Sequence, residues 1–289
     1  MTQTDLAGKG ALVTGGGSGI SLSFVQHLYH AGANVLICDI ALHHEAVAWL
    51  ESIQHSSRVA FRTVDVTDWK QLESAYDEYG HIFGGIPDIV CPGAGIYEPS
   101  SPNFWNDQDE SFYKMIRINL EHPLKLSRMA IRKFVQTKQP GIIVHVSSTG
   151  AQKPSMFTPL YGAAKQGISN FVRCMAGLQD MEDIRVVAVA PGPTMSPLMY
   201  DHPEALKLVD QDKDQLCQPD EVGRAMMAVC FDREQFASGT VLEVTHPDCW
   251  RQVSLLNDPG PGLNAYTSNR KEGLVAVVAA LDADRHSTE

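Results

Sequence analysis

Short apolar runs alternate with segments of helical length along most of the chain, and turn-forming residues mark many of the boundaries. Runs of this kind predict buried strands, and the longer segments between them predict helices. The predicted strands are 10–14, 34–39, 59–66, 88–92, 141–148, 184–190 and 239–245. The predicted helices are 19–32, 42–54, one starting near an N-capping Asp68, one within 108–137, 159–180 and one near 219–231.

Strands this apolar need cover on both faces, which is typical of a parallel sheet between two layers of helices. Right-handed crossovers then give a doubly wound sheet that binds ligands outside the carboxyl ends of its strands. We therefore predict an α/β fold with a single Rossmann-type domain over residues 1–245 and a mostly parallel, seven-stranded sheet. Residues 246–269 are rich in turn formers and 270–282 predict a helix, so 246–289 is interpreted as a C-terminal extension.

Composition restricts the possible partners. The chain has 289 residues and a net charge of -11, which argues against nucleic acid, because phosphate binding needs clustered Lys and Arg. Its six cysteines lack the spacing of a metal site, so reduced thiols and no bound metal are expected. Neither a signal pattern nor an apolar run near the ~18 residues of a membrane span is visible. These features favour a soluble cytoplasmic protein with no membrane partner.

The stretch 11–24, ALVTGGGSGISLSF, places a glycine turn between a predicted strand and a predicted helix. Backbone N–H groups of such a turn and the positive end of the helix dipole bind a pyrophosphate. Gly15 allows the tight turn and Gly19 the close approach, whereas the third position of the pattern holds Ser21. We expect Ser21 to be tolerated, with its hydroxyl bonded to the preceding helical turn. A strand-to-helix turn that binds nothing is the alternative.

Asp39 ends the second predicted strand, where a carboxylate accepts hydrogen bonds from the adenosine ribose hydroxyls. It would repel a 2′-phosphate and has no basic neighbour in sequence, which favours NAD over NADP; a helix N-cap is the alternative role. Asp65 and Val66 close the third strand, where they could meet the adenine. The small residues 93–95 close the fourth and would let the cofactor lie against the backbone, although both segments could also be ordinary turns.

Tyr161 and Lys165 stand at positions i and i+4 of a predicted helix, so both side chains lie on one face. A phenol of pKa ~10 is a poor base at neutral pH, but a nearby lysine cation and a nicotinium ring favour the phenolate. Two exposed helix residues are the alternative interpretation. Ser148, or Ser147 if the register shifts by one, follows the fifth strand and could hold the substrate oxygen. Asn119 is a poor helix former among apolar neighbours, which suggests a polar task such as holding a water.

Taken together, these motifs resemble those of the short-chain dehydrogenase/reductase family from about residue 6 to 245. The family's N-N-A-G motif reads Pro-Gly-Ala-Gly at 92–95, and its glycine motif departs at Ser21. The resemblance implies a catalytic tetrad of Asn119, Ser148, Tyr161 and Lys165. It also implies cofactor contacts at Gly15, Gly17, Ser18, Gly19, Ile20, Asp39, Asp65, Val66, Gly93, Ala94, Gly95, Tyr161, Lys165, Pro191, Gly192 and Thr194.

By this resemblance the protein is an NAD-dependent oxidoreductase that interconverts a secondary alcohol and a ketone, with Tyr161 as general acid or base. Lys165 would bind the nicotinamide ribose, Ser148 would orient the substrate oxygen, and Asn119 would support a proton relay. An NADPH-dependent ketoreductase is the alternative within the class. A non-catalytic NAD-binding sensor or scaffold is the alternative outside it, although a sensor has no need of the tyrosine and lysine.

The stretch after Pro191-Gly192 corresponds to the family's mobile lid, 195–218. Its Met195, Leu198, Met199 and Tyr200 either form an apolar substrate wall or anchor the lid, and Tyr97 with Trp105 could form the opposite wall. We therefore expect a hydrophobic small-molecule substrate and no polyanion. The tail resembles that of prostaglandin-dehydrogenase-like members and of tailoring enzymes of secondary metabolism. Family members usually dimerise through the helices of Asn119 and Tyr161, which implies a homodimer or homotetramer.

Overall fold

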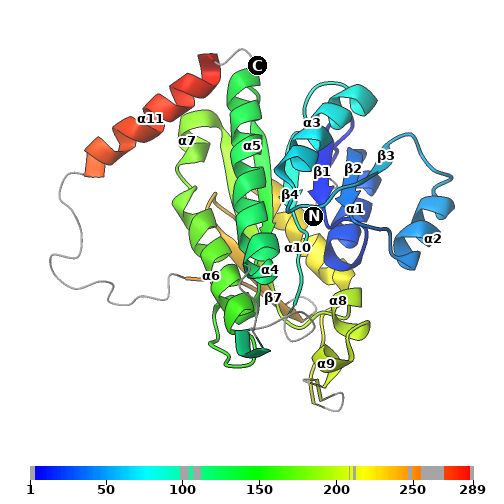
Figure 1. The fold of residues 1–289 in the computed structure, drawn as a ribbon. Coiled ribbons are helices and arrows are strands. Elements are labelled where there is room, and N and C mark those ends of the chain that lie inside the picture. The colour runs from blue at the N-terminus through cyan, green and yellow to red at the C-terminus, as the bar shows by residue number, and fades with distance from the viewer. Residues whose placement is uncertain are drawn as a thin grey trace.

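A computed structural model describes residues 4–97, 104–106, 112–207, 209–210, 213–246, 249–254 and 270–286. The chain forms one sheet of eight strands in the order β3-β2-β1-β4-β5-β6-β7-β8 (Figure 1). Parallel pairing joins β1 through β7, as the apolar runs predict. The strands are β1 Gly10–Thr14, β2 Asn34–Asp39, β3 Val59–Thr63, β4 Ile89–Pro92, β5 Gly141–Val146, β6 Ile184–Pro191, β7 Val241–His246 and β8 Cys249–Gln252.

Helices cover both faces of this sheet and bury two apolar layers. Helices α3, α5 and α6 supply the layer on one face, and α1 and α10 supply the layer on the other. The α-helices are α1 Gly19–His30, α2 His44–Ser52, α3 Trp69–Phe83, α4 Lys114–Ile116, α5 His122–Thr137, α6 Pro159–Cys174, α7 Leu178–Glu182, α8 Pro197–Tyr200, α9 Pro203–Leu206, α10 Pro219–Phe231 and α11 Arg270–His286. Short 3-10 turns η1 Phe104–Asn106 and η3 Thr149–Ala151 and a π-helical turn η2 Arg117–Glu121 complete the described elements.

The prediction of seven strands was wrong. β8, inside the C-terminal extension, pairs antiparallel with β7 and extends the sheet by one edge strand. Its four residues, Cys-Trp-Arg-Gln, are largely exposed, so they carry none of the apolar pattern that marks the buried strands. Contacts with residues distant in sequence hold β8 in place, since the Trp250 indole donates to Glu221 of α10 at 2.6 Å.

Farther along the extension, α11 lies against α5 (Figure 1). Leu281 is buried there, and Arg128 of α5 makes a two-pronged ion pair with Asp284 at 2.7 and 2.9 Å. The helix predicted over 270–282 thus continues to His286. Across the described part of the chain, no helix combines the length and apolar character that a membrane crossing requires.

Candidate active site

A cavity of about 1110 Å³ opens along the carboxyl ends of the parallel strands. A single small-molecule site occupies roughly 300–1,000 Å³, so this cavity has room for a dinucleotide and a second molecule. Its wall includes all of the residues predicted to bind the cofactor except Gly17, together with Ser148. Seven segments that are distant in sequence therefore meet at one edge, because parallel strands all end on the same side.

The glycine turn after β1 is shaped by two glycines with left-handed backbones, Gly15 at φ +68° and Gly19 at φ +53°. A Cβ on Gly15 would lie 2.5 Å from the Cα of Ala94, so this position also needs glycine for space. Within the described residues, no side chain caps the start of α1. The N–H groups at this helix end, which lines the cavity, are therefore available to an anion.

Ser21 bonds differently from the expectation. Its hydroxyl donates to the carbonyl of Gly93 at 3.4 Å, across to the turn after β4, and not to the preceding turn of α1. A Cβ built on Gly93 would lie 2.3 Å from the Ser21 Oγ. The two departures from the family pattern thus fit each other, because the serine side chain occupies space that a larger residue at 93 would take.

This fit gives a stability prediction. Gly93→Ala should lower the free energy of unfolding by about 1–3 kcal/mol, the usual cost of overpacking a tight contact. Ser21→Gly in the same chain should restore part of that loss, while the contact of the new Cβ with the Thr14 carbonyl, at 2.9 Å, keeps the rescue incomplete. Urea unfolding of the two single variants and the double variant measures the coupling; strictly additive effects would show that the positions are independent.

Thr14 and His122 form a hydrogen-bonded pair that holds the turn after β4. The Thr14 hydroxyl lies 3.0 Å from the His122 Nε2 and accepts hydrogen bonds from the N–H groups of Gly93 at 3.1 Å and Ala94 at 3.4 Å. The His122 Nδ1 faces the Ile118 carbonyl at 3.1 Å, so Nδ1 carries the proton and Nε2 accepts from Thr14. Burial lowers the pKa of His122 to about 4, which keeps the imidazole neutral in this role.

Asp39 lies at the end of β2 with its carboxylate in the cavity wall. One oxygen accepts from the Gly17 N–H at 2.9 Å and the other from the Ile40 N–H at 2.7 Å. Burial raises the pKa of Asp39, and these backbone hydrogen bonds oppose that rise. Gly17 is outside the wall; its N–H is directed at Asp39, and a Cβ there would lie 2.4 Å from the Ala41 carbonyl. Gly17 therefore orients the carboxylate.

Ser148 and Tyr161 are neighbours at the other end of the cavity. The Ser148 hydroxyl accepts from the Gly150 N–H at 3.0 Å and also hydrogen-bonds the Tyr161 phenol. Ser147, the other candidate, is buried and directed into α6, where its hydroxyl donates to the Lys165 carbonyl at 3.0 Å. Of the two serines, the structure therefore brings Ser148 to the phenol.

The Tyr161 phenol and the Lys165 ammonium lie on the same side of α6, as their spacing predicts. The Lys165 Nζ is 5.6 Å from the centre of the Tyr161 ring and donates to the Val146 carbonyl at 2.8 Å. Burial raises the pKa of Tyr161 to about 12, against the opposing effect of the Ser148 hydrogen bond, and burial lowers the pKa of Lys165 to about 8. In this fold, desolvation outweighs the expected effect of the lysine on the phenol.

Asn119 lies in the π-helical turn η2, fully buried, and its amide clamps one residue of the turn after β4. Oδ1 accepts from the Ile96 N–H at 2.9 Å, and Nδ2 donates to the Ile96 carbonyl at 2.7 Å. Asn119, which is a poor helix former, therefore lies in an irregular helical turn and has a specific polar task, namely its two hydrogen bonds to Ile96. A part in proton relay stays a prediction; it rests on the closeness of Asn119 and Lys165, which both lie beside Gly95.

The predicted lid, 195–218, forms another part of the cavity wall. Leu198 and Met199 line the cavity, whereas the Tyr200 hydroxyl donates to Glu45 of α2 at 2.8 Å. Met195 is outside the wall. Both roles considered for these residues thus occur in the lid, since the first two face the cavity and Tyr200 anchors the lid to α2.

Two aromatic residues proposed for the opposite wall differ in position. Tyr97 lines the cavity and packs edge-on against Tyr161, with ring centroids 4.8 Å apart. Trp105 is 60% exposed and outside the cavity wall, and its indole donates to the Met156 carbonyl at 2.7 Å. Of this pair, only Tyr97 is in a position to touch a substrate.

Among the wall residues that the sequence did not single out are Ile40, Lys114 and Lys153. Ile40 is 72% exposed and directly follows Asp39, so its place in the wall could have been anticipated from that neighbour. Lys153 lies between Ser148 and Tyr161, which was a usable signal. Lys114 comes from α4, a segment that only the tertiary fold brings to the cavity.

A doubly wound sheet with a serine, a tyrosine and a lysine around one cavity at its carboxyl edge is the arrangement of an oxidoreductase. The chain belongs to the short-chain dehydrogenase family, because the short chain dehydrogenase model matches residues 9–206. The resemblance noted from the motifs is thereby confirmed.

Among similar proteins is the cis-4-hydroxycyclohexanecarboxylate dehydrogenase of Sinomonas cyclohexanicum, 32% identical, with 81% of this chain and 94% of that protein aligned. The 3beta-hydroxysteroid dehydrogenase 2 of Eggerthella lenta is 30% identical over 66% of this chain and 73% of its own length. The crystal structure of a 3-ketoacyl-(acyl-carrier-protein) reductase from Brucella melitensis complexed with NADH superposes with a TM-score of 0.70. It is 23% identical, covers 83% of this chain and 98% of that one, and shows the shared fold.

Proposed function

We propose that this protein is an NAD-dependent dehydrogenase that interconverts a secondary alcohol and a ketone on a hydrophobic small molecule. The observation that carries the proposal is the hydrogen-bonded pair of Ser148 and Tyr161, with Lys165 beneath it, inside a cavity large enough for a cofactor and a substrate. Relatives named for a hydroxycyclohexane acid and a hydroxysteroid act on cyclic secondary alcohols, which supports the same substrate type here.

The residues present fit a dinucleotide. The open start of α1 and the left-handed Gly15 and Gly19 offer an anion-binding turn for the pyrophosphate. The fixed carboxylate of Asp39 would accept hydrogen bonds from the adenosine ribose. Among the described wall residues, Lys114, Lys153 and Lys165 are the Lys and Arg side chains, and none of them belongs to the segments beside Asp39. This arrangement favours NAD over its 2′-phosphorylated form.

When bound, the nicotinamide supplies the hydride acceptor or donor, and the protein supplies position and proton transfer. Ser148 would hold the substrate oxygen beside the phenol. Tyr161 would take the proton of an alcohol, or give a proton to a ketone, through that same oxygen. Lys165, fixed by the Val146 carbonyl, would donate to the ribose and place a positive charge near the phenolate. Asn119 holds Ile96, and with it the turn at the inner end of the cavity.

The test uses a panel of cyclic secondary alcohols, including a hydroxysteroid and cis-4-hydroxycyclohexanecarboxylate, with NADH absorbance followed from pH 7 to pH 10. Turnover with NAD should exceed turnover with NADP by at least about tenfold in kcat/KM, because Asp39 repels the extra phosphate. Asp39→Ala should reduce this ratio, while Asp65→Ala is the comparison at the adenine side. Equal use of both cofactors would refute the NAD assignment, and cofactor binding without turnover of any substrate would indicate a sensor.

A further inference from the structure

The charged side chains of the cavity wall are divided between its two ends. The three acidic residues of the described wall lie at the adenosine end: Asp39 after β2, Asp65 after β3, and Asp201, which faces His43 at the start of α2 at 3.5 Å. Lys114 and Lys153 also line the cavity, Lys114 from α4, which packs against the helix of Tyr161, and Lys153 from the segment between Ser148 and Tyr161. Although the chain has a net charge of -11, none of the acidic residues of the described wall comes from the segment of Lys114 or from that of Lys153.

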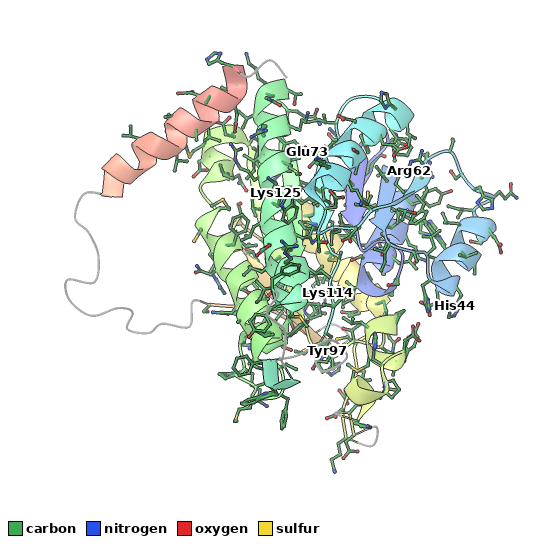
Figure 2. The ribbon with its side chains drawn as sticks, viewed as in Figure 1. His44, Arg62, Glu73, Tyr97, Lys114 and Lys125 are labelled. Atoms are coloured by element: carbon green, nitrogen blue, oxygen red, sulfur yellow. The ribbon has the colours of Figure 1, made fainter. Side chains whose placement is uncertain are left out.

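Two segments bring these lysines to the substrate end. Lys153 follows the turn η3, which starts after Ser148, and its segment leads into the helix of Tyr161. Lys114 opens α4, which packs against α6. Its neighbour Met115 places its sulfur 3.1 Å from the Asn119 amide, so α4 is fixed close to the reacting groups. Figure 2 shows Lys114 and Tyr97 toward the same end of the molecule, whereas Lys125 lies farther along α5.

Neither lysine is neutralised within the described part of the chain. Both side chains are exposed, and among the described residues neither makes a hydrogen bond or ion pair to a carboxylate. By contrast, the acidic residues at the other end are already engaged, since Asp39 accepts from two backbone N–H groups and Asp65 from Thr67. Among the described residues, no carboxylate therefore offsets the positive charge of these two lysines.

The surface between the lysines and Tyr161 is apolar. Tyr97 packs on Tyr161, and Met156 and Phe157 line the cavity while remaining 74% and 72% exposed. Large apolar side chains left this accessible around a cavity mark a surface that contacts an apolar ligand. A ligand that satisfies both features has an apolar body facing the phenol and an anionic group directed outward to the lysines.

Building on the proposed function, we propose that the substrate is an alicyclic secondary alcohol or ketone that bears a carboxylate, which Lys114 and Lys153 recognise at the cavity mouth. The reacting hydroxyl would lie at Ser148 and Tyr161, and the carboxylate at the opposite end of the apolar body. The lysines would act on specificity alone, because hydride and proton transfer take place at the far end of the substrate. The expected gain is about fivefold per lysine, as for an exposed ion pair.

The experiment compares each carboxylate of a panel of cyclic hydroxy acids with its methyl ester and its primary amide, using NAD and the full chain. The acids should show kcat/KM at least about tenfold above their neutral partners, mostly through KM, and added salt should reduce this preference. Lys114→Met and Lys153→Met should each lower kcat/KM for the acids about fivefold and leave the esters unchanged. Lys125→Met, whose ammonium lies over Trp69 at 5.8 Å and outside the cavity wall, is the matched control.

The outcomes separate the two proposals. If esters and acids are used equally well, or if the lysine variants lower both alike, the carboxylate assignment is wrong while the dehydrogenase assignment stands. If no acid, ester or amide is oxidised with NAD, the proposed function itself has failed. A selective loss on the acids in Lys114→Met and Lys153→Met, with ester turnover retained, supports recognition by the lysines.

Discussion

Tyr161→Phe should lower kcat at least about 1,000-fold and leave the affinity for NAD within about twofold, because the phenol is the group placed to exchange a proton with the substrate. The ring of the variant keeps the packing against Tyr97, so the cavity is preserved. Burial raises the pKa of Tyr161 to about 12, so the phenol is protonated at neutral pH. Oxidation of an alcohol should therefore accelerate as the pH rises from 7 to 10, whereas ketone reduction, which uses the protonated phenol, should not.

Steady-state NADH absorbance and a fluorescence titration of the cofactor check the two halves of this prediction. Tyr29→Phe is the matched control, because it removes a phenol hydroxyl from α1, where the ring packs under Arg58 away from the cavity wall. That variant should retain parental turnover. Full activity in Tyr161→Phe would remove the phenol from the mechanism, and loss of cofactor binding would show that the substitution disturbs the cavity instead.

A large loss of stability is expected in mild acid, because two histidines are buried in their neutral form. Burial lowers the pKa of His122 to about 4 and that of His145 to about 3, whereas an unfolded histidine titrates near 6.5. Below pH 6.5 the unfolded chain binds protons that the folded chain does not. The free energy of unfolding contributed by each histidine is thus complete above that pH and is lost as the pH falls toward 4 or 3. Between pH 7.5 and pH 5 each should cost about 2 kcal/mol.

His145→Leu tests this directly, since the difference between unfolding free energies at the two pH values cancels its constant effect on packing. The drop should be smaller by about 2 kcal/mol in the variant than in the parent. His145 suits the experiment because its Nδ1 has no partner in the described structure, and only its Nε2 bonds, to Ser127 at 3.1 Å. His81→Gln, at an exposed site in α3, should keep the parental drop. An unchanged drop in His145→Leu would show that other groups control acid stability.

Much of the architecture could be predicted because its signals are local. Buried parallel strands need continuous apolar runs, so β1 through β7 are visible in the sequence, and Asp68 caps α3 as its residue type predicts, with N–H groups of Lys70 and Gln71 bonded to its carboxylate. The spacing of Tyr161 and Lys165 likewise fixes their common side of α6. The exposed strand β8 has no such signal, since its pairing with β7 and the contact of Trp250 with Glu221 stabilise it from outside.

The amino-acid sequence by itself determined the alternation of strands and helices, the sheet edge at which the candidate site lies, and the residue types gathered there, because apolar period and motif spacing are properties of neighbouring residues. Only the tertiary structure decided which atoms meet: Ser21 with Gly93, Asn119 with Ile96, Ser148 and not Ser147 with Tyr161. It also decided that burial raises the pKa of Tyr161 and that Lys114 shares a cavity with Lys153. Desolvation and contact across the fold depend on packing between distant segments, which no local pattern encodes.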